Sequence, residues 1–282
     1  MASAKSLQSE QTSAATDSGF FSRGMFSKKL KATLCVALSM GIHIYESGKR
    51  NPTAIIMVHG AGGSSTIWSM QVRALSKKAH VMAIDLNGHG KTPDRRPTDV
   101  LKSYLDDIES VVRLCDEPVL VGHSMGGALA QLYALDRSED LGGLVLVGTG
   151  ARLRVAPMIF NLLDNNPEGY FEALAEFMFH ESAPKDMVQA SQAEARKCPV
   201  PIIRRDFELC NTFDVMQRIG QISIPTLVIV GENDVMTPIK YATYLHDNIA
   251  NSDLQVLPQA GHGVMLERAP EFNEAVVRWL GV

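Results

Sequence analysis

The sequence predicts an α/β fold with a mostly parallel sheet, helices on both faces and an inserted helical cap. Short runs rich in Val, Ile and Leu recur along the chain, with helix-like patterns between them. Most of these runs are apolar at every position, which is typical of strands buried on both faces. The alternation stops over residues 151–221, where helix-like stretches follow one another without a strand run.

The predicted strands belong to a core made of residues 32–150 and 222–282. We expect the first two runs to form an antiparallel edge. In chain order the runs are ATLCVAL (32–38), IHIYES (42–47), TAIIMVHG (53–60), AHVMAIDL (79–86), PVLVGHS (118–124), LGGLVLVG (141–148), PTLVIVG (225–231) and DLQVLP (253–258).

The predicted cap, residues 151–221, contains three helix-like stretches separated by prolines: PEGYFEALAEFMFH, PKDMVQASQAEARK and PIIRRDFELC. Such an insertion would lie beside the carboxyl ends of the strands, where open α/β sheets bind ligands. Four phenylalanines of the cap either line a pocket or form the core of the cap itself: Phe160, Phe171, Phe177 and Phe179.

Composition narrows the class of function. The 282 residues suffice for one sizeable core, and the formal net charge of -4 gives no broad attraction for nucleic acid or anionic membranes. The four cysteines are widely scattered, without the spacing of a zinc site or a redox pair. They read as reduced thiols, which suits a cytoplasmic protein. We expect a small-molecule substrate and neither nucleic acid nor membrane as a partner.

The first residues, 1–31, read as a flexible tail rich in Ser, Ala, Gln and Thr. Two alternatives stay open. Lys28, Lys29 and Lys31 with the apolar residues 32–40 could form a signal peptide, and FFSRGMFSKKLK could form an anchor at a membrane surface. No apolar run in the sequence approaches the roughly 20 residues of a membrane-spanning helix.

The stretch VLVGHSMGGALAQLYAL places a serine on a turn between a strand and a helix. Gly122-His123-Ser124-Met125-Gly126 matches the G-x-S-x-G nucleophile elbow and stands where that motif requires. Flanking glycines allow a strained turn that presents the hydroxyl above the sheet. Ser124 is therefore the candidate nucleophile.

A serine nucleophile needs a base, and the base needs an acid that orients it. Asp234 follows the run PTLVIVG, and His262 follows LQVLP in a glycine-flanked loop. Glu232 is an alternative acid, and Asp234 could instead cap the next helix. His246, the other downstream histidine, falls within a helical pattern, so His262 is the candidate base.

The candidate oxyanion hole consists of the backbone N–H groups of Ala61 and Met125. Ala61 lies in the loop His59-Gly60-Ala61-Gly62-Gly63 after a strand, and Met125 follows the nucleophile. A plain glycine-rich turn is the alternative for that loop. Neither G-x-x-x-x-G-K nor G-x-G-x-x-G is present, so a phosphate loop is not indicated.

Together, HGAGGSSTIW, DLNGHGKT, GHSMGG, GENDVMTP and AGHGVMLE resemble the α/β-hydrolase superfamily. The resemblance covers the chain from about residue 41 to its end, except for the cap. It implies a mostly parallel sheet, a helical cap after the sixth strand and a Ser-Asp-His triad, carried here by Ser124, Asp234 and His262. It implies no metal or organic cofactor.

Within this superfamily, the motif GHSMGG resembles carboxylesterases and monoacylglycerol lipases, which predicts ester hydrolysis. Serine at the elbow disfavours the epoxide hydrolase and haloalkane dehalogenase branches, which use Asp there. Gly263 after His262 disfavours meta-cleavage C–C hydrolases, which usually have Trp at that place. A lactonase, a C–C hydrolase, a cofactor-free haloperoxidase and a small-molecule receptor with the same fold stay open as alternatives.

Overall fold

The computed structural model describes residues 41–282, and its centre is a seven-stranded sheet in the order β1-β3-β2-β4-β5-β6-β7. All neighbouring strands are parallel except β1, which pairs antiparallel with β3 at one edge. The strands are β1 (Ile44–Ser47), β2 (Ala54–Val58), β3 (His80–Ile84), β4 (Val119–His123), β5 (Gly143–Val147), β6 (Thr226–Gly231) and β7 (Ser252–Leu257). The predicted α/β fold with a mostly parallel sheet is confirmed.

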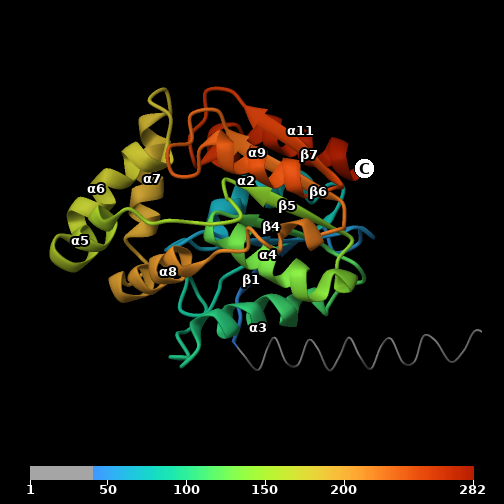
Figure 1. The fold of residues 1–282 in the computed structure, drawn as a ribbon, viewed down its shortest axis with the longest axis horizontal. Helices are drawn as coiled ribbons and strands as arrows, with labels where there is room; N and C mark the ends of the chain where they lie inside the picture. Colours follow the sequence, from blue (N-terminus) through green and yellow to red (C-terminus); the bar gives the residue numbers. More distant parts are fainter. Residues whose placement is uncertain (1–40) are drawn as a thin grey trace, which may run out of the picture.

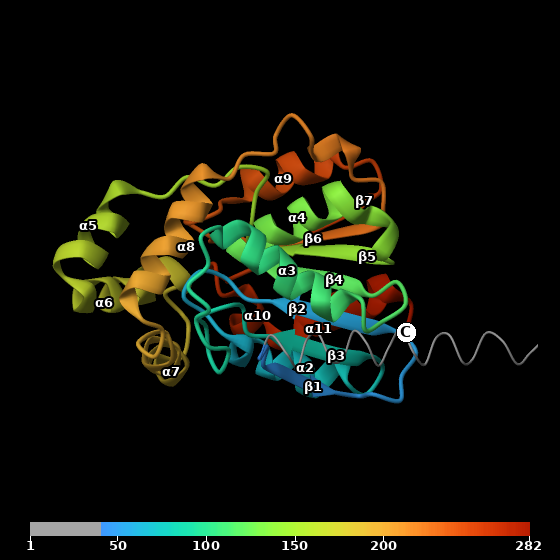
Figure 2. The same ribbon diagram turned by 90° about the horizontal axis from the view of Figure 1, so that it is seen from below.

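Helices cover both faces of the sheet, as Figure 2 shows. Successive residues of the buried strands point to opposite faces. Ile55 belongs to the hydrophobic cluster on one face, with Trp68 and Phe272, and Ile56 belongs to the cluster on the other face, with Tyr104. One face carries α2 (Ser69–Leu75) and α11 (Ala269–Leu280), and the other carries α3 (Val100–Val112), α4 (Met125–Arg137) and α9 (Ile239–Asn248).

Four α-helices, which we call the cap helices, lie between β5 and β6 and project from one end of the sheet (Figure 1). They are α5 (Pro157–Asn165), α6 (Pro167–Met178), α7 (Lys185–Ala195) and α8 (Val200–Thr212). The chain leaves the sheet and returns to it at neighbouring points, because Arg152 and Asp214 form an isolated antiparallel bridge. The C-terminus lies at the opposite end of the molecule.

Short helices complete the described chain: η1 (Ser65–Trp68), η2 (Ser138–Asp140), η3 (Ile219–Gln221) and α10 (Val264–Glu267). The run 42–47 supplies the antiparallel edge strand, whereas the run 32–38 and the tail lie outside the described residues. The division into core 32–150 and 222–282 with cap 151–221 stays a prediction. Within residues 41–282, no helix combines the length and apolar character needed to cross a bilayer.

Candidate active site

Ser124 occupies a strained turn between β4 and α4, with φ 53° and ψ -115°. A side chain at Gly122 would come within 2.2 Å of the carbonyl oxygen of Gly126, so the strand and helix can approach only without a Cβ there. The Ser124 N–H donates to Val147 O at 2.9 Å, and its C=O accepts from Thr149 Oγ1 at 2.9 Å. These two hydrogen bonds hold the backbone of Ser124 in the turn, and the residue lines the cavity.

Asp234 and His262 lie on the loops after β6 and β7, and the structure brings their side chains together. His262 Nδ1 lies 2.8 Å from Asp234 Oδ2, and both residues are at least 95 % buried. Burial opposes ionisation of the carboxyl group, but the neighbouring His262 and the hydrogen bonds from His262 and Thr237 outweigh it and lower the pKa of Asp234 to about 2. Asp234 is therefore ionised at neutral pH.

The loop after β6 holds the Asp234 carboxylate in place. Oδ1 accepts from the N–H groups of Met236 and Thr237 at 2.9 and 2.8 Å, and Oδ2 accepts from Thr237 Oγ1 at 2.7 Å. Asp234 does not cap α9, whose N-cap is Pro238. The alternative acid, Glu232, is exposed. Thr237 was not among the residues predicted from the sequence, although its position three residues after an Asp is typical of a side chain bonded within a turn.

The backbone N–H of Ala61 differs from those of the two glycines that follow it in its hydrogen bonding. Gly63 N–H donates to Gly60 O at 3.1 Å, and Gly62 N–H donates to Asp206 Oδ2 at 2.9 Å. Ala61 and Met125 have no backbone N–H bond to any residue in the described part of the chain. Within the described residues these two N–H groups have no acceptor, whereas the N–H of Gly62 does, and Ala61 also lines the cavity beside Ser124.

A cavity of about 520 Å³ opens onto Ser124 and His262. Neither Ser124 Oγ nor His262 Nε2 has a hydrogen-bond partner among residues 41–282. The rest of the lining is mostly apolar and comes largely from α6, α7 and α8. It includes Leu174, Met178, Met187, Ile203, Phe207 and Met236.

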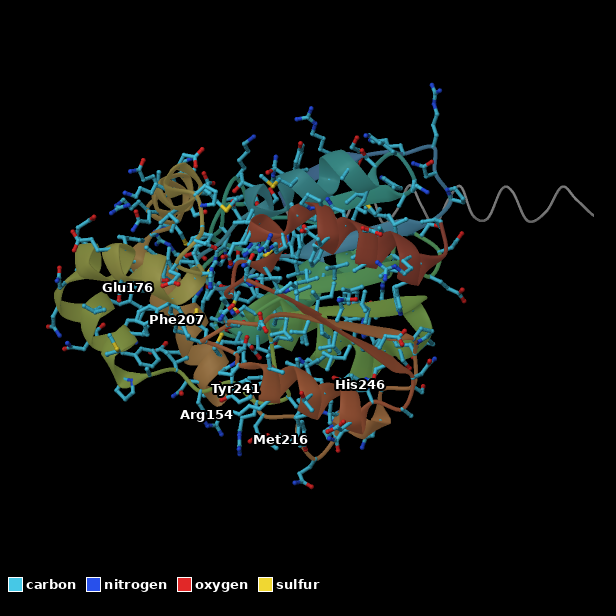
Figure 3. All side chains as sticks on the ribbon, turned by 90° about the horizontal axis from the view of Figure 1, so that it is seen from above. Arg154, Glu176, Phe207, Met216, Tyr241 and His246 are labelled. Carbon is cyan, nitrogen blue, oxygen red and sulfur yellow. The ribbon has the colours of Figure 1, made fainter. Side chains whose placement is uncertain are left out.

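The four phenylalanines considered at the sequence level do not line this cavity. Phe171 is buried in a cap cluster, and Phe160 and Phe177 pack against the same cluster. Phe179 is buried beside Gly263. Phe207 on α8 lines the cavity instead, and Figure 3 shows it on the cap, apart from His246 on α9.

His123 supports the loop that carries His262. Its Nε2 lies 3.0 Å from the carbonyl oxygen of His262, so Nε2–H is the donor. Burial, together with the nearby His262, lowers the pKa of His123 to about 3. The ring is therefore neutral at physiological pH and acts as a fixed hydrogen-bond donor to the backbone.

Glu267 connects the same loop to the cap. Its two carboxylate oxygens accept from Gly261 N–H and from His180 N–H, each at 2.8 Å. Gly263 N–H donates to Met178 O at 2.7 Å, which adds a second bond between the end of α6 and the loop. Glu267 could not be predicted from the sequence, because its partner at His180 is distant in the chain.

Among the residues that the structure describes, no three His, Cys, Asp or Glu side chains are grouped so as to hold a metal ion. Around the cavity lie a hydroxyl on a strained turn and an imidazole at hydrogen-bond distance from a buried carboxylate, groups that can act as nucleophile, base and acid.

Comparisons with known proteins identify the family. The model of a family described as "Alpha/beta hydrolase family" matches residues 55–275. A protein of Variovorax paradoxus named "Putative carbamate hydrolase RutD" is 28 % identical over 86 % of this chain and 96 % of its own. The "Pimeloyl-[acyl-carrier protein] methyl ester esterase" of Nitrosomonas europaea is 27 % identical over 82 % of this chain and 96 % of its own.

A solved structure, "Structure of a thermophilic esterase", is 36 % identical with a TM-score of 0.76 and covers 85 % of this chain and 93 % of that one. The family match spans most of the sheet and the helices inserted into it. The chain therefore belongs to the alpha/beta hydrolase family and is a hydrolase of that fold.

Proposed function

We propose that this hydrolase cleaves carboxylic esters through a covalent acyl-enzyme, with Ser124, His262 and Asp234 as its catalytic triad. The observation that carries the proposal is the 2.8 Å contact between His262 Nδ1 and Asp234 Oδ2 beside a cavity onto which Ser124 also opens. The esterase names of two similar proteins support the same reaction.

In the first half of the reaction, His262 Nε2 takes the proton of the Ser124 hydroxyl while Oγ attacks the ester carbonyl. Asp234, ionised and buried, stabilises the imidazolium that forms. The N–H groups of Ala61 and Met125 donate to the oxyanion of the tetrahedral intermediate. The C–O bond to the alcohol then breaks, and His262 gives its proton to the leaving oxygen.

In the second half, water enters and His262 removes a proton from it as its oxygen attacks the acyl carbon. The same two N–H groups stabilise the second oxyanion, the bond to Ser124 Oγ breaks, and His262 returns the proton to the serine. Each proton transfer uses one imidazole, and the reaction requires no metal or organic cofactor.

The cavity favours an uncharged ester over a small anion. Its volume of about 520 Å³ lies within the range usual for small-molecule sites. None of the described residues that line it is Lys or Arg, and α7 contributes two carboxylates, Asp186 and Glu194. An anion in this place would lose its hydration without gaining a counter-ion. A neutral ester with an apolar acyl chain fits the lining better.

The test is hydrolysis of p-nitrophenyl esters from acetate to palmitate by the wild-type protein and by Ser124→Ala. We expect rapid release by the wild type and a loss on the order of 10⁶ in turnover for the variant. Alanine keeps the same Cβ as serine, so the elbow should fold, and an unchanged thermal midpoint would verify this.

Release that survives Ser124→Ala would contradict the triad. A folded wild-type protein that hydrolyses no ester would contradict ester cleavage, and lactones, C–C substrates and ligand binding would then be examined. The chain-length optimum would also show how much of the cavity the acyl group fills.

A further inference from the structure

The carboxylate of Asp206, on the cap helix α8, is completely buried and connects three separate parts of the molecule. Oδ2 accepts from Gly62 N–H at 2.9 Å and contacts His89 Nε2 at 2.7 Å, and Oδ1 accepts from Tyr104 OH at 2.6 Å. Gly62 belongs to the loop after β2, His89 to the loop after β3, and Tyr104 to α3. A cap side chain therefore reaches the loop that carries the candidate oxyanion donor.

His89 provides the charge that makes this burial tolerable. Its Nε2 faces Asp206, and its Nδ1 lies 3.2 Å from the carbonyl oxygen of Asn87, so both ring nitrogens meet acceptors and both are donors. Burial opposes the charge on His89, but Asp206 overcomes it and raises the pKa of the imidazole. Asp206 is thus one half of a buried ion pair, and its spare acceptor capacity is directed at Gly62.

At the loop, Gly62 has φ +64°, and a Cβ there would lie 3.0 Å from Cγ1 of Ile203, which is also on α8. Helix α8 therefore touches Gly62 both by a hydrogen bond and by packing. Gly60 O accepts from Gly63 N–H and from His59 Nδ1, which fixes the peptide before Ala61. The C=O of Gly60 and the N–H of Gly62 are thus both hydrogen-bonded, and these two bonds fix the peptide groups before and after Ala61. They therefore determine the orientation of the Ala61 N–H.

We propose that Asp206 is a positioning residue for the oxyanion hole: by holding the Gly62 N–H, it aims the Ala61 N–H at the substrate oxygen. This inference rests on the proposed ester hydrolysis. Asp206 itself does not line the cavity. Its loss should therefore weaken the transition state while leaving ground-state binding of the ester almost unchanged.

The experiment compares Asp206→Asn with Asp107→Asn. Asp107 is a matched control, because it is an equally buried carboxylate that accepts from a backbone N–H, that of Asn87, at 2.8 Å and pairs with Arg95, but it does not bond the loop 60–63. Both substitutions should lower the thermal midpoint. For Asp206→Asn we expect kcat to fall on the order of 10- to 100-fold with KM within about twofold. For Asp107→Asn we expect little change in either constant.

The inhibition constant of a ketone that forms a tetrahedral adduct separates the two explanations, because a general loss of stability would not change it. An alkyl trifluoromethyl ketone forms a bond from Ser124 Oγ to its carbonyl carbon, while the serine proton passes to His262 and the carbonyl oxygen becomes an oxyanion. Asp206→Asn should weaken its inhibition by the same factor as kcat. Unchanged inhibition and kcat in a folded Asp206→Asn protein whose Gly62 amide has lost its protection from exchange would overturn the inference, whereas a wild type without esterase activity would contradict the proposed function instead.

If Asp206→Asn does not fold, or if its amide oxygen keeps the bond to the Gly62 N–H, amide NMR of the wild type decides the question. The Gly62 amide should be protected from exchange and should shift little when the ketone binds. The Ala61 amide should move downfield, because it gains the oxyanion as acceptor. A Gly62 amide that exchanges freely, or that shifts more than the Ala61 amide, would overturn the inference.

Discussion

Thr237 Oγ1 donates a hydrogen bond to Asp234 Oδ2, the same oxygen that His262 Nδ1 contacts. The Thr237 hydroxyl and the His262 imidazole therefore both stabilise the negative charge on this oxygen. Thr237 Oγ1 also lies 3.3 Å from His262 Nδ1, so it stands beside the contact that orients the base.

Replacing Thr237 by Val removes this donor and keeps the shape of the side chain. We expect the pKa of Asp234 to rise and kcat for ester hydrolysis to fall about 10-fold, because a hydrogen bond to a charged group contributes about 1.5–3 kcal/mol. Steady-state kinetics would measure the fall in kcat. Thr237→Ser, which restores a hydroxyl, should recover most of the activity; equal losses in the two variants would assign the effect to packing.

Glu267→Gln tests the connection between the cap and the His262 loop. The carboxylate accepts from two backbone N–H groups, whereas an amide offers one acceptor oxygen and turns its NH₂ group toward the other N–H. We expect a loss of about 1–3 kcal/mol in the free energy of unfolding and a lower kcat. Urea unfolding and ester kinetics measure these, with exposed Glu271→Gln as control. A fully stable and active Glu267→Gln protein would contradict the expectation.

Two buried neutral histidines should make the fold sensitive to mild acid. Burial lowers the pKa of His59 to about 4 and that of His123 to about 3, below the ordinary value of 6.5. As pH falls below 6.5, the unfolded chain binds protons at these positions while the folded chain does not. The free energy of unfolding therefore decreases, by about 2 kcal/mol per histidine between pH 6.5 and 5.

Urea unfolding of the wild type and of His123→Gln at pH 7.5 and pH 5.0 isolates the contribution of one histidine. Glutamine does not titrate and keeps a donor near the His262 carbonyl. The variant should be less stable at pH 7.5 yet lose about 2 kcal/mol less on acidification. If both proteins lost the same amount, His123 would have to be protonated in the folded state.

The lining of the cavity predicts discrimination by charge. The p-nitrophenyl ester of hexanoate and the mono-p-nitrophenyl ester of adipate have the same chain length and differ by one carboxylate. We expect kcat/KM to be at least about 10-fold higher for the neutral ester, because the lining includes the carboxylate of Asp186 and no described Lys or Arg. Glu194 also lines the cavity, but it is paired with Lys197 outside the lining. Asp186→Asn should therefore narrow the difference, and equal rates of the wild type on the two esters would contradict this expectation.

Much of the fold could be predicted from the sequence, because its signals are local. A strand buried on both faces must be apolar throughout, so the strands around Val121, Val145 and Val228 could be predicted from their apolar runs alone. The elbow at Ser124 depends on glycines within two residues of it. Asp234 and His262 follow strands of a parallel sheet, whose carboxyl ends lie at one edge, so their proximity followed from chain order.

The remaining parts depend on contacts between distant segments. Asp206 lies in the amphipathic pattern of α8, between the buried residues Ile203 and Phe207, and a carboxylate on an apolar face is the one local sign that it has a buried partner. Which cap phenylalanine meets the cavity depends on how α5 and α6 pack, and periodicity does not determine this. The roles of Ser124, Asp234 and His262 stay a prediction that the geometry supports.

The hydrogen bond between Gly62 and Asp206 joins positions 144 residues apart in the chain. During synthesis at about 5–20 residues per second, the loop after β2 therefore waits roughly 7–30 s for its partner carboxylate. Asp234 and His262 are made later still. The candidate site is thus complete only after residues 61–262 have all been made, and contacts of such long range also slow refolding.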